Sequence, residues 1–311
     1  MVQAPQFQWR FLLPQYWLLW FGVALMWLIS WLPYSVLMAL GSGLGRLLYA
    51  ALKSRRKVAE RNIALCFPKM PQAEQTALVK RNFAETGKAL FDTVIAWWWP
   101  NWRIKKYAHF KGYEHIAQAV GEGKGVLLLA AHFLHLEGAG RAFGLTHPSV
   151  GFYRPHNNDL MDYLQYNGRI KANKYMIGKR DVKGLIAALN QQEVCFYLPD
   201  QDYGRNRAEF VPFFAVPDTA TTTGTLLFAN AANCAVIPVI TSRLPGNLGY
   251  QVEALPALDN FPSGDDKADV TRVNQWVEQA VLRHPEQYMW LHRRFKTRPD
   301  PAAPSLYKGV K

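Results

Sequence analysis

The hydrophobic pattern divides the chain into an apolar start and a long body of alternating elements. Residues 71–99 have the apolar spacing of a helix, with Leu78, Phe83, Leu90 and Phe91 among the apolar positions. Short apolar runs of strand length, bounded by turn residues, occur at 125–131, 149–153, 194–198, 235–241 and 250–255. Helix-length segments occur at 136–143, 160–173, 183–191, 222–233 and 270–284. This alternation predicts an α/β fold with a mostly parallel sheet flanked by helices.

The apolar start has the character of a membrane anchor. After Arg10, no charged residue occurs until Arg46. Residues 16–32 read YWLLWFGVALMWLISWL, a run of 17 residues at the short end of what a spanning helix needs. Pro33 should end or kink this helix, and glycines interrupt the apolar run that continues to residue 48. We therefore expect an N-terminal hydrophobic membrane-anchor helix, which either spans the bilayer or lies in one leaflet.

Tryptophans and flanking charges add to this expectation. At about 100° per residue, four tryptophans of the apolar run share one helical stripe, which either packs on protein or lies at the lipid interface: Trp17, Trp20, Trp27 and Trp31. Six basic residues and one acid, Glu60, follow between residues 46 and 61. Because positive charge stays on the cytoplasmic side, the body should face the cytoplasm, against anionic lipid headgroups.

Composition narrows the class of partner. The chain has 311 residues, half of them hydrophobic, so it is long enough for a large core and is not disordered. Its formal charge of +13 favours an anionic partner, such as a membrane surface, nucleic acid or an acidic protein. The three cysteines, Cys66, Cys195 and Cys234, have no CxxC spacing, which disfavours a disulfide framework or a cysteine zinc site.

The candidate chemistry follows the strand predicted to begin at residue 125. His132 stands at the carboxyl end of that strand, the edge where sites form in open α/β sheets. Glu137 comes five residues later and can meet His132 only if the histidine lies on the turn before the next helix. A carboxylate bonded to one imidazole nitrogen leaves the other free as a base. The alternatives are a core histidine with a surface glutamate, or a metal site that includes His135, whose HxxHxE spacing is weak.

Eight blocks of sequence carry a family resemblance. The H-x-x-x-x-E arrangement of His132 and Glu137 resembles the signature of the lysophospholipid acyltransferase superfamily. The chain most resembles its lipid A biosynthesis late acyltransferase branch, in particular the lauroyl-transferring members. The matching blocks include GVLLLAAHFLHLE, GFYRPHNN, LPDQDYG and EQYMWLHRRFKTRP, and in full they cover residues 14–23, 55–68, 125–137, 151–158, 198–204, 210–216, 220–225 and 286–299.

The resemblance implies a reaction and roles for five residues. His132 would be the general base and Glu137 its orienting carboxylate. Arg169 would bind a lipid phosphate or support the reacting groups, Asp200 would be a further active-site carboxylate, and Arg154 would contact substrate. The acyl donor would be acyl carrier protein, and the acceptor a hydroxyl of the lipid A precursor Kdo2-lipid IVA. Neither a metal nor an organic cofactor would be needed.

The resemblance, taken with the apolar start, the flanking charges and the prolines of the C-terminal segment, suggests a location and a division of the chain. The protein would lie at the bacterial inner membrane with its catalytic domain facing the cytoplasm. Residues 1–45 would form the anchor, residues 46–298 the acyltransferase domain, and residues 299–311, which hold proline at three positions including Pro299, a flexible tail. Taken singly, Arg154 and Arg169 could also be solvated surface groups, and Asp200 and Asp202 could shape a turn.

Other chemistries lack their motifs. The sequence has no GxSxG nucleophile elbow and no GxxxxGK[ST] phosphate loop. The basic run HRRFKTR at 292–298 favours an alternative in which a membrane-tethered basic protein binds anionic lipid or nucleic acid without catalysis. No nucleic-acid-binding motif accompanies that run, so nucleic acid is not the expected partner.

Overall fold

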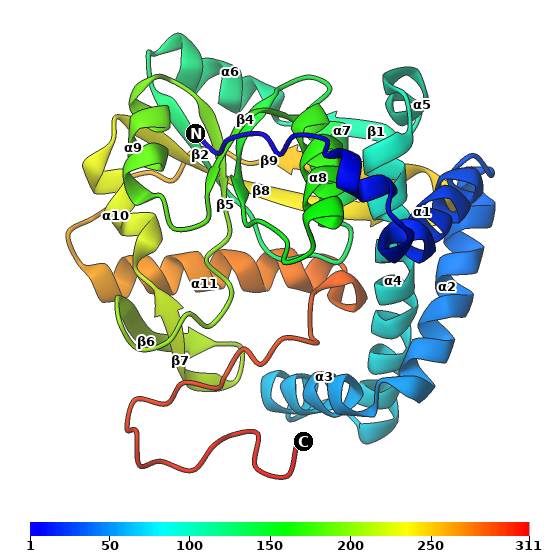
Figure 1. Cartoon of the computed structure of the whole chain (residues 1–311). Coiled ribbons are helices and arrows are strands. Elements are labelled where there is room, and N and C mark those ends of the chain that lie inside the picture. The colour runs from blue at the N-terminus through cyan, green and yellow to red at the C-terminus, as the bar shows by residue number, and fades with distance from the viewer. Residues whose placement is uncertain (311) are drawn as a thin grey trace.

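The body is built on one large sheet. The computed structural model describes residues 1–310, and its strands are β1 (Ala108–Lys111), β2 (Gly125–Leu129), β3 (Ser149–Tyr153), β4 (Asn173–Gly178), β5 (Val194–Tyr197), β6 (Ala208–Phe213), β7 (Val216–Thr222), β8 (Cys234–Leu244) and β9 (Gly249–Ala254). Seven of them form the sheet β1-β9-β8-β2-β5-β3-β4, and β6 and β7 form a separate hairpin (Figure 1). Every neighbouring pair in this sheet is parallel except β8 with β9. The mostly parallel sheet is therefore confirmed.

Helices cover both faces of the sheet. They are α1 (Trp17–Ser30), α2 (Tyr34–Ala51), α3 (Lys53–Cys66), α4 (Gln72–Trp98), α5 (Asn101–Lys105), α6 (Tyr113–Gly121), α7 (Leu136–Phe143), α8 (Asp159–Arg169), α9 (Val182–Asn190), α10 (Gly224–Ala231) and α11 (Asp266–Arg283). Alternate residues of β2 enter different cores: Val126 and Leu128 join the core that includes α6 and α7, whereas Leu127 and Leu129 join the core that includes α9 and α11. Both faces of β2 are therefore covered by protein, which explains why its sequence is a continuous apolar run.

The structure adds elements that the hydrophobic pattern did not predict. Strands β1, with sequence AHFK, and β4, with sequence NKYMIG, form the two edges of the sheet. Both carry exposed or half-exposed polar side chains, as edge strands commonly do, so neither reads as an apolar run. By contrast, β3 and α7 have the bounds expected for them, 149–153 and 136–143.

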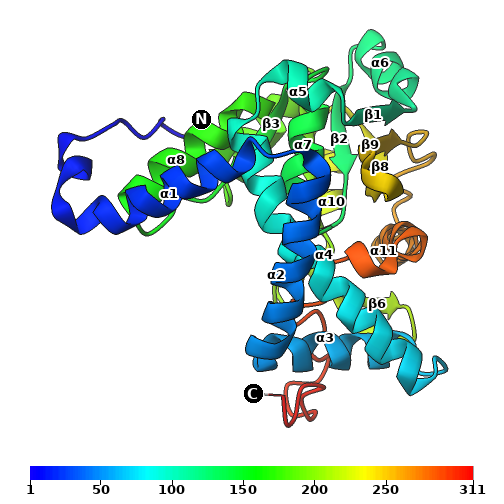
Figure 2. The same cartoon turned by 90° about the vertical axis from the view of Figure 1, so that its right-hand side faces the viewer.

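The glycines of α2 permit close packing and do not interrupt the helix. A side chain at Gly45 would collide with the backbone of Phe83 and Ala84 in α4, and one at Gly87 would collide with the backbone of Gly41 and Gly45. The two helices therefore pack backbone to backbone (Figure 2). The boundary proposed between residues 45 and 46 falls inside α2, and the domain division stays a prediction.

The N-terminal segment forms an arm beside α8. In Figure 2, α1 extends away from the body at the end of α2, and Pro33 separates the two helices as expected. The ring of Phe7 packs against Tyr163 of α8, while α1 exposes large apolar side chains such as Leu18 and Phe21. Where an anchor helix was expected over 16–32, the structure has the 14-residue helix α1, and its role as an anchor stays a prediction.

A helix that crosses a bilayer must be both long and apolar. Singly, none of the described helices is both long and apolar enough; only α2 and α3 taken together are, and they meet at a bend of 95°.

The C-terminal segment after residue 298 contacts the body at Leu306 and Tyr307, and its expected flexibility stays a prediction. Tyr307 is buried, donates a hydrogen bond to Asn62 of α3, and accepts one of 3.0 Å from the backbone N–H of Phe295. Arg61 of α3 also donates to the carbonyl oxygen of Leu306 at 2.6 Å. The buried ring and hydrogen-bonded hydroxyl of Tyr307 thus attach this proline-containing segment, which lacks regular secondary structure, to the body.

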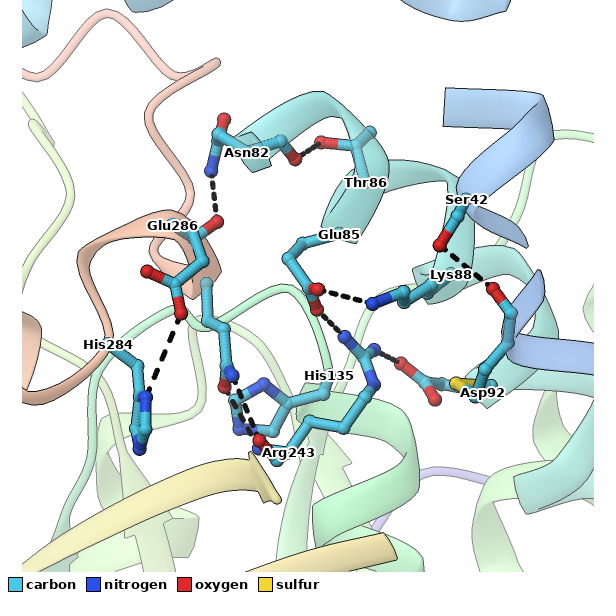
Figure 3. A network of polar contacts seen from close by, with 12 residues as sticks. Ser42, Asn82, Glu85, Thr86, Lys88, Asp92, His135, Arg243, His284 and Glu286 are labelled. Atoms are coloured by element: carbon cyan, nitrogen blue, oxygen red, sulfur yellow. Dashed lines mark hydrogen bonds and ion pairs between the residues drawn. The ribbon is translucent and has the colours of Figure 1, made fainter. Parts of the chain in front are cut away.

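A buried group of charges joins α4 to the sheet. Arg243 of β8 reaches between Glu85 and Asp92 of α4 and pairs with both (Figure 3). Tyr250 of β9 donates to Asp92 from the other side. The side chains of Arg243 and Asp92 are 4% and 0% exposed. We call Glu85, Asp92, Arg243 and Tyr250 the sealed cluster.

Candidate active site

His132 and Asp200 meet because their strands are neighbours in register. β2 and β5 pair in parallel, with Leu129 opposite Tyr197. His132 lies three residues after Leu129, and Asp200 lies three residues after Tyr197. Both side chains consequently emerge at the same carboxyl edge of the sheet, as expected for His132.

Asp200 holds His132 by its backbone and its ring. One carboxylate oxygen accepts the backbone N–H of His132 at 2.9 Å, and the other lies 2.6 Å from Nδ1 of the imidazole. Because a carboxylate only accepts hydrogen bonds, Nδ1 carries the proton and Nε2 has a free lone pair. Burial raises the pKa of Asp200, but the charge and hydrogen bonds of His132, with the charge of Arg294, outweigh it and lower that pKa. Asp200 therefore stays ionised.

Residues 285–290 support the turn that carries His132 through backbone hydrogen bonds. The carbonyl oxygen of His132 accepts the N–H of Met289 at 3.0 Å, and the N–H of Leu134 donates to Gln287 at 2.8 Å. Asn82 of α4 in turn donates to the carbonyl oxygens of Glu286 and Tyr288, the first of which is drawn in Figure 3. This bracing fixes the backbone from which the imidazole extends.

Glu137 has a different partner from the one expected. Its carboxylate accepts Nε of Arg169 at 2.9 Å and also pairs with Nη2 of the same guanidinium. Glu137 lies in the first turn of α7 and Arg169 ends α8, so the pair links these two helices. The carboxylate bonded to the His132 ring is Asp200, and the expectation that Glu137 orients this ring is wrong as to geometry. We call His132, Glu137, Arg169 and Asp200 the open cluster.

Two cavities open at His132. The outer cavity has a volume of about 810 Å³, and the inner cavity has about 270 Å³. Both are bordered by His132, Leu136, Phe152, Arg169 and Leu198, so they meet at the open cluster. The side chain of His132 is 19% exposed, whereas that of Asp200 is 1% exposed.

The outer cavity is lined by cations. Arg154 directly follows β3, Lys179 directly follows β4, and Arg207 precedes β6. The side chains of these three residues form no hydrogen bond or ion pair with the described part of the chain, and within residues 1–310 no carboxylate lines this cavity. The resemblance pointed to Arg154 but not to the other two. Lys179 could have been found only by recognising β4, whose polar start hides it.

The remaining candidates have structural partners. His135 is fully buried with its Nε2 bonded to Thr241 Oγ1 at 3.1 Å, and burial lowers its pKa to about 3, so it is neutral. Asp202 accepts hydrogen bonds from Thr297 and Gly204. In the basic run at 292–298, Arg294 is buried and donates to Ala220 and Thr221. Residues 1–310 hold no group of three or more His, Cys, Asp or Glu placed for a metal ion.

Fold and site together define an α/β protein with a histidine–carboxylate pair at the carboxyl edge of a parallel sheet. Residues 4–297 match the family described as bacterial lipid A biosynthesis acyltransferase. The chain is 43% identical to the lipid A biosynthesis lauroyltransferase of Escherichia coli K12, over 99% of this chain and 100% of that one. It is 44% identical to a lipid A biosynthesis acyltransferase of Haemophilus influenzae, over 98% of each chain, and 40% identical to the lipid A biosynthesis palmitoleoyltransferase of Escherichia coli K12, over 94% and 96%. The chain therefore belongs to the bacterial lipid A biosynthesis acyltransferase family.

Proposed function

We propose that the protein transfers a fatty acyl chain, with lauroyl the expected one, from acyl carrier protein to a hydroxyl of Kdo2-lipid IVA. The observation that carries this proposal is the hydrogen bond from His132 Nδ1 to Asp200 at the mouth of two cavities. An imidazole held in this tautomer accepts a proton at Nε2, which is what activating an alcohol requires. The similarity to a lauroyltransferase over the whole chain supports the choice of acyl group.

In this mechanism the acceptor hydroxyl attacks the thioester carbonyl carbon while His132 Nε2 takes its proton. The new carbon–oxygen bond forms a tetrahedral intermediate. When the intermediate collapses, the carbon–sulfur bond breaks and the imidazolium gives its proton to the departing thiolate, which leaves as the free thiol of the carrier. Asp200 stabilises the imidazolium throughout, and Glu137 acts on Arg169 instead of on the imidazole.

The outer cavity suits the anionic part of the acceptor. The side chains of Arg154, Lys179 and Arg207 form no hydrogen bond or ion pair with the described chain, and Arg169 borders the same space. Unpaired guanidinium and ammonium groups bind phosphate and carboxylate oxygens. We assign these four cations to acceptor binding, which places the acceptor's reacting hydroxyl beside His132.

The carrier and the membrane account for other surfaces. Acyl carrier proteins are acidic, in keeping with the formal charge of +13. The apolar side chains that α1 exposes, among them Leu18, Phe21 and Leu28, would lie in the inner membrane, with the catalytic domain on the cytoplasmic side. No metal or organic cofactor takes part in the proposed reaction.

An assay of the purified protein tests the substrates. Wild-type protein is mixed with Kdo2-lipid IVA and one of two donors, lauroyl-loaded carrier or lauroyl-coenzyme A. The masses of the lipid products are then measured by mass spectrometry. We expect one added lauroyl group, formed faster from the carrier than from coenzyme A. Lipid that binds the protein without gaining mass would instead support a binding protein without catalysis.

The membrane surface has its own test. Replacing Leu18, Phe21 and Leu28 together by serine should lower partition into vesicles of anionic lipid at least tenfold, since burying each such side chain contributes about 1.5–3 kcal/mol. Leu282, which α11 exposes at 59%, provides the matched control. Equal partition of the triple variant and Leu282→Ser would contradict the assignment of α1.

A further inference from the structure

The inner cavity differs from the outer one in how its polar side chains are used. Glu137 is paired with Arg169, Ser149 donates to Asn173, and Thr241 is bonded to His135. Apart from His132 and Arg141, the remaining lining is apolar or small, with Leu136, Phe152, Phe196 and Leu198 among its side chains. A cavity in which most polar groups already bond one another has little to offer a charged headgroup and suits a hydrocarbon chain.

Arg141 also borders this cavity, and we take it as the far end of the space that begins at His132. Its two terminal nitrogens donate to Asn101 and to the carbonyl oxygen of Lys171, which hold the guanidinium in place, while its Nε has no partner among residues 1–310. A methyl end that reached further would have to lie against this buried cation. The side chain therefore acts as an end wall, which limits the length of chain that fits.

Helix α7 forms one wall between the catalytic histidine and this end. Leu136, Glu137, Gly140 and Arg141 all border the cavity and share one face of α7. Gly140 lies one helical turn beyond Leu136, or roughly 6 Å further along the axis. The cavity thus extends from His132 past Gly140 toward Arg141.

Gly140 is the one glycine in this wall with room for a side chain. A Cβ at Gly151 would lie 2.6 Å from Asn173, and one at Gly168 would lie 2.3 Å from the ring of Trp97, so packing explains both. A Cβ at Gly140 would have no atom within 4 Å. Glycine inside a helix is unfavourable, and here it relieves no contact within the described chain. Because Gly140 has no side chain, the cavity has open space at this position.

We propose that the inner cavity holds the distal part of the donor acyl chain and that Gly140 determines the longest chain accepted. This inference rests on the proposed acyl transfer and deepens it. A Cβ at position 140 meets no described atom within 4 Å, and side chains of increasing size would extend from α7 into the cavity that Gly140 borders. Each would shorten the space available to the hydrocarbon, and the preferred donor would become shorter.

The test is a competition between donors. Carriers loaded with decanoyl, lauroyl, myristoyl and palmitoyl chains are mixed in equal amounts with the acceptor, and the products are separated by mass. In Gly140→Leu, the ratio of the wild-type's preferred product to the product two carbons shorter should fall about tenfold or more, the discrimination that a pocket makes for one methylene or two. Gly140→Ala should shift the ratio in the same direction by less. It adds a single carbon to open space, so it keeps the test valid if the leucine variant does not fold.

Gly43 provides the matched control. It also lies inside a helix, α2, has no atom within 4 Å of an added Cβ, and does not border either cavity. Gly43→Leu should leave the product distribution unchanged.

Three results would overturn the inference: an unchanged distribution in a folded Gly140→Leu protein, equal loss of all four products, or a shift produced by Leu227→Trp in the outer cavity and not at Gly140. Absence of any product from wild-type protein would instead refute the proposed function itself.

Discussion

The sealed and open clusters contain similar charged groups but differ in what surrounds them. In the sealed cluster, Arg243 pairs with two carboxylates of α4, and its side chain is 4% exposed. In the open cluster, Arg169 pairs with a single carboxylate, and its side chain is 34% exposed beside two cavities. The difference in exposure therefore distinguishes an ion pair that joins α4 to the sheet from one that a substrate can reach. The comparison predicts that changes in the sealed cluster affect stability first, and changes in the open cluster affect rate first.

The largest effect on stability is expected in the sealed cluster. Arg243→Met leaves Asp92 buried without its cation and leaves Glu85 with Lys88 alone, and breaking a buried pair in this way costs about 3–5 kcal/mol of unfolding free energy. Denaturant unfolding measures this loss. Arg283→Met serves as control, because Arg283 pairs with Glu253 at the surface and should contribute about 1 kcal/mol or less. Equal losses in the two variants would show that burial does not distinguish these pairs.

In the open cluster, Asp200→Asn should reduce the rate strongly. An amide in place of the carboxylate no longer stabilises the imidazolium and can impose the wrong tautomer on His132. We expect kcat to fall about 100-fold or more. Steady-state kinetics together with denaturant unfolding separates this loss from misfolding. A variant with normal kcat would show that the hydrogen bond to Asp200 is not used in the reaction.

A smaller effect is expected from Arg169→Lys. Lysine keeps the charge but cannot donate to Glu137 through two nitrogens, as Nε and Nη2 of Arg169 do. Losing one charge-assisted hydrogen bond corresponds to a loss of about tenfold or more in kcat/KM. A rise in KM for the lipid alone would assign Arg169 to acceptor binding, and a fall in kcat alone to support of the reacting groups. A rise in KM for the carrier alone would place Arg169 on the docking surface and contradict its assignment.

The smallest effect concerns pH. The folded-state pKa of Asp200 is lowered, so the stability that its ionised form provides is present above the unfolded-state pKa of about 3.9 and is lost as pH falls through the lower, folded-state value. The difference in unfolding free energy between wild type and Asp200→Asn should therefore shrink below about pH 4. Denaturant unfolding between pH 3 and 7 measures it. A difference that stays constant or grows in acid would contradict the lowered pKa.

The hydrophobic pattern predicted the elements that carry the site but not how they pair. The run at 125–131 and the helix at 136–143 placed His132 on a turn at the carboxyl edge, and the structure has it there. The partner of His132 depends on which strand lies beside β2. That strand is β5, and strand order comes from packing across the whole body, so spacing along the chain favoured the nearer Glu137.

Polar edge strands and isolated side-chain contacts limited the prediction in the same way. Lys179 borders the outer cavity because β4 ends just before it, but the sequence NKYMIG lacks the apolar run of a central strand. Tyr307 holds the C-terminal tail through one ring and one hydroxyl, a contact that a proline-containing sequence does not reveal. In α2, the glycines read as interruptions because their close neighbour, α4, lies more than thirty residues further along the chain.

The central claim is that His132 is the base of acyl transfer, and the transfer rate of His132→Ala tests it most directly. The measurement is a single-turnover transfer from loaded carrier to Kdo2-lipid IVA, with unfolding free energy recorded on the same preparations. His109→Ala is the control, since His109 lies on the edge strand β1, away from both cavities. Our account predicts that His132→Ala folds normally and transfers about 10²–10⁴ times more slowly, the range for loss of a general base. A folded His132→Ala protein that transfers at the rate of wild type would contradict it.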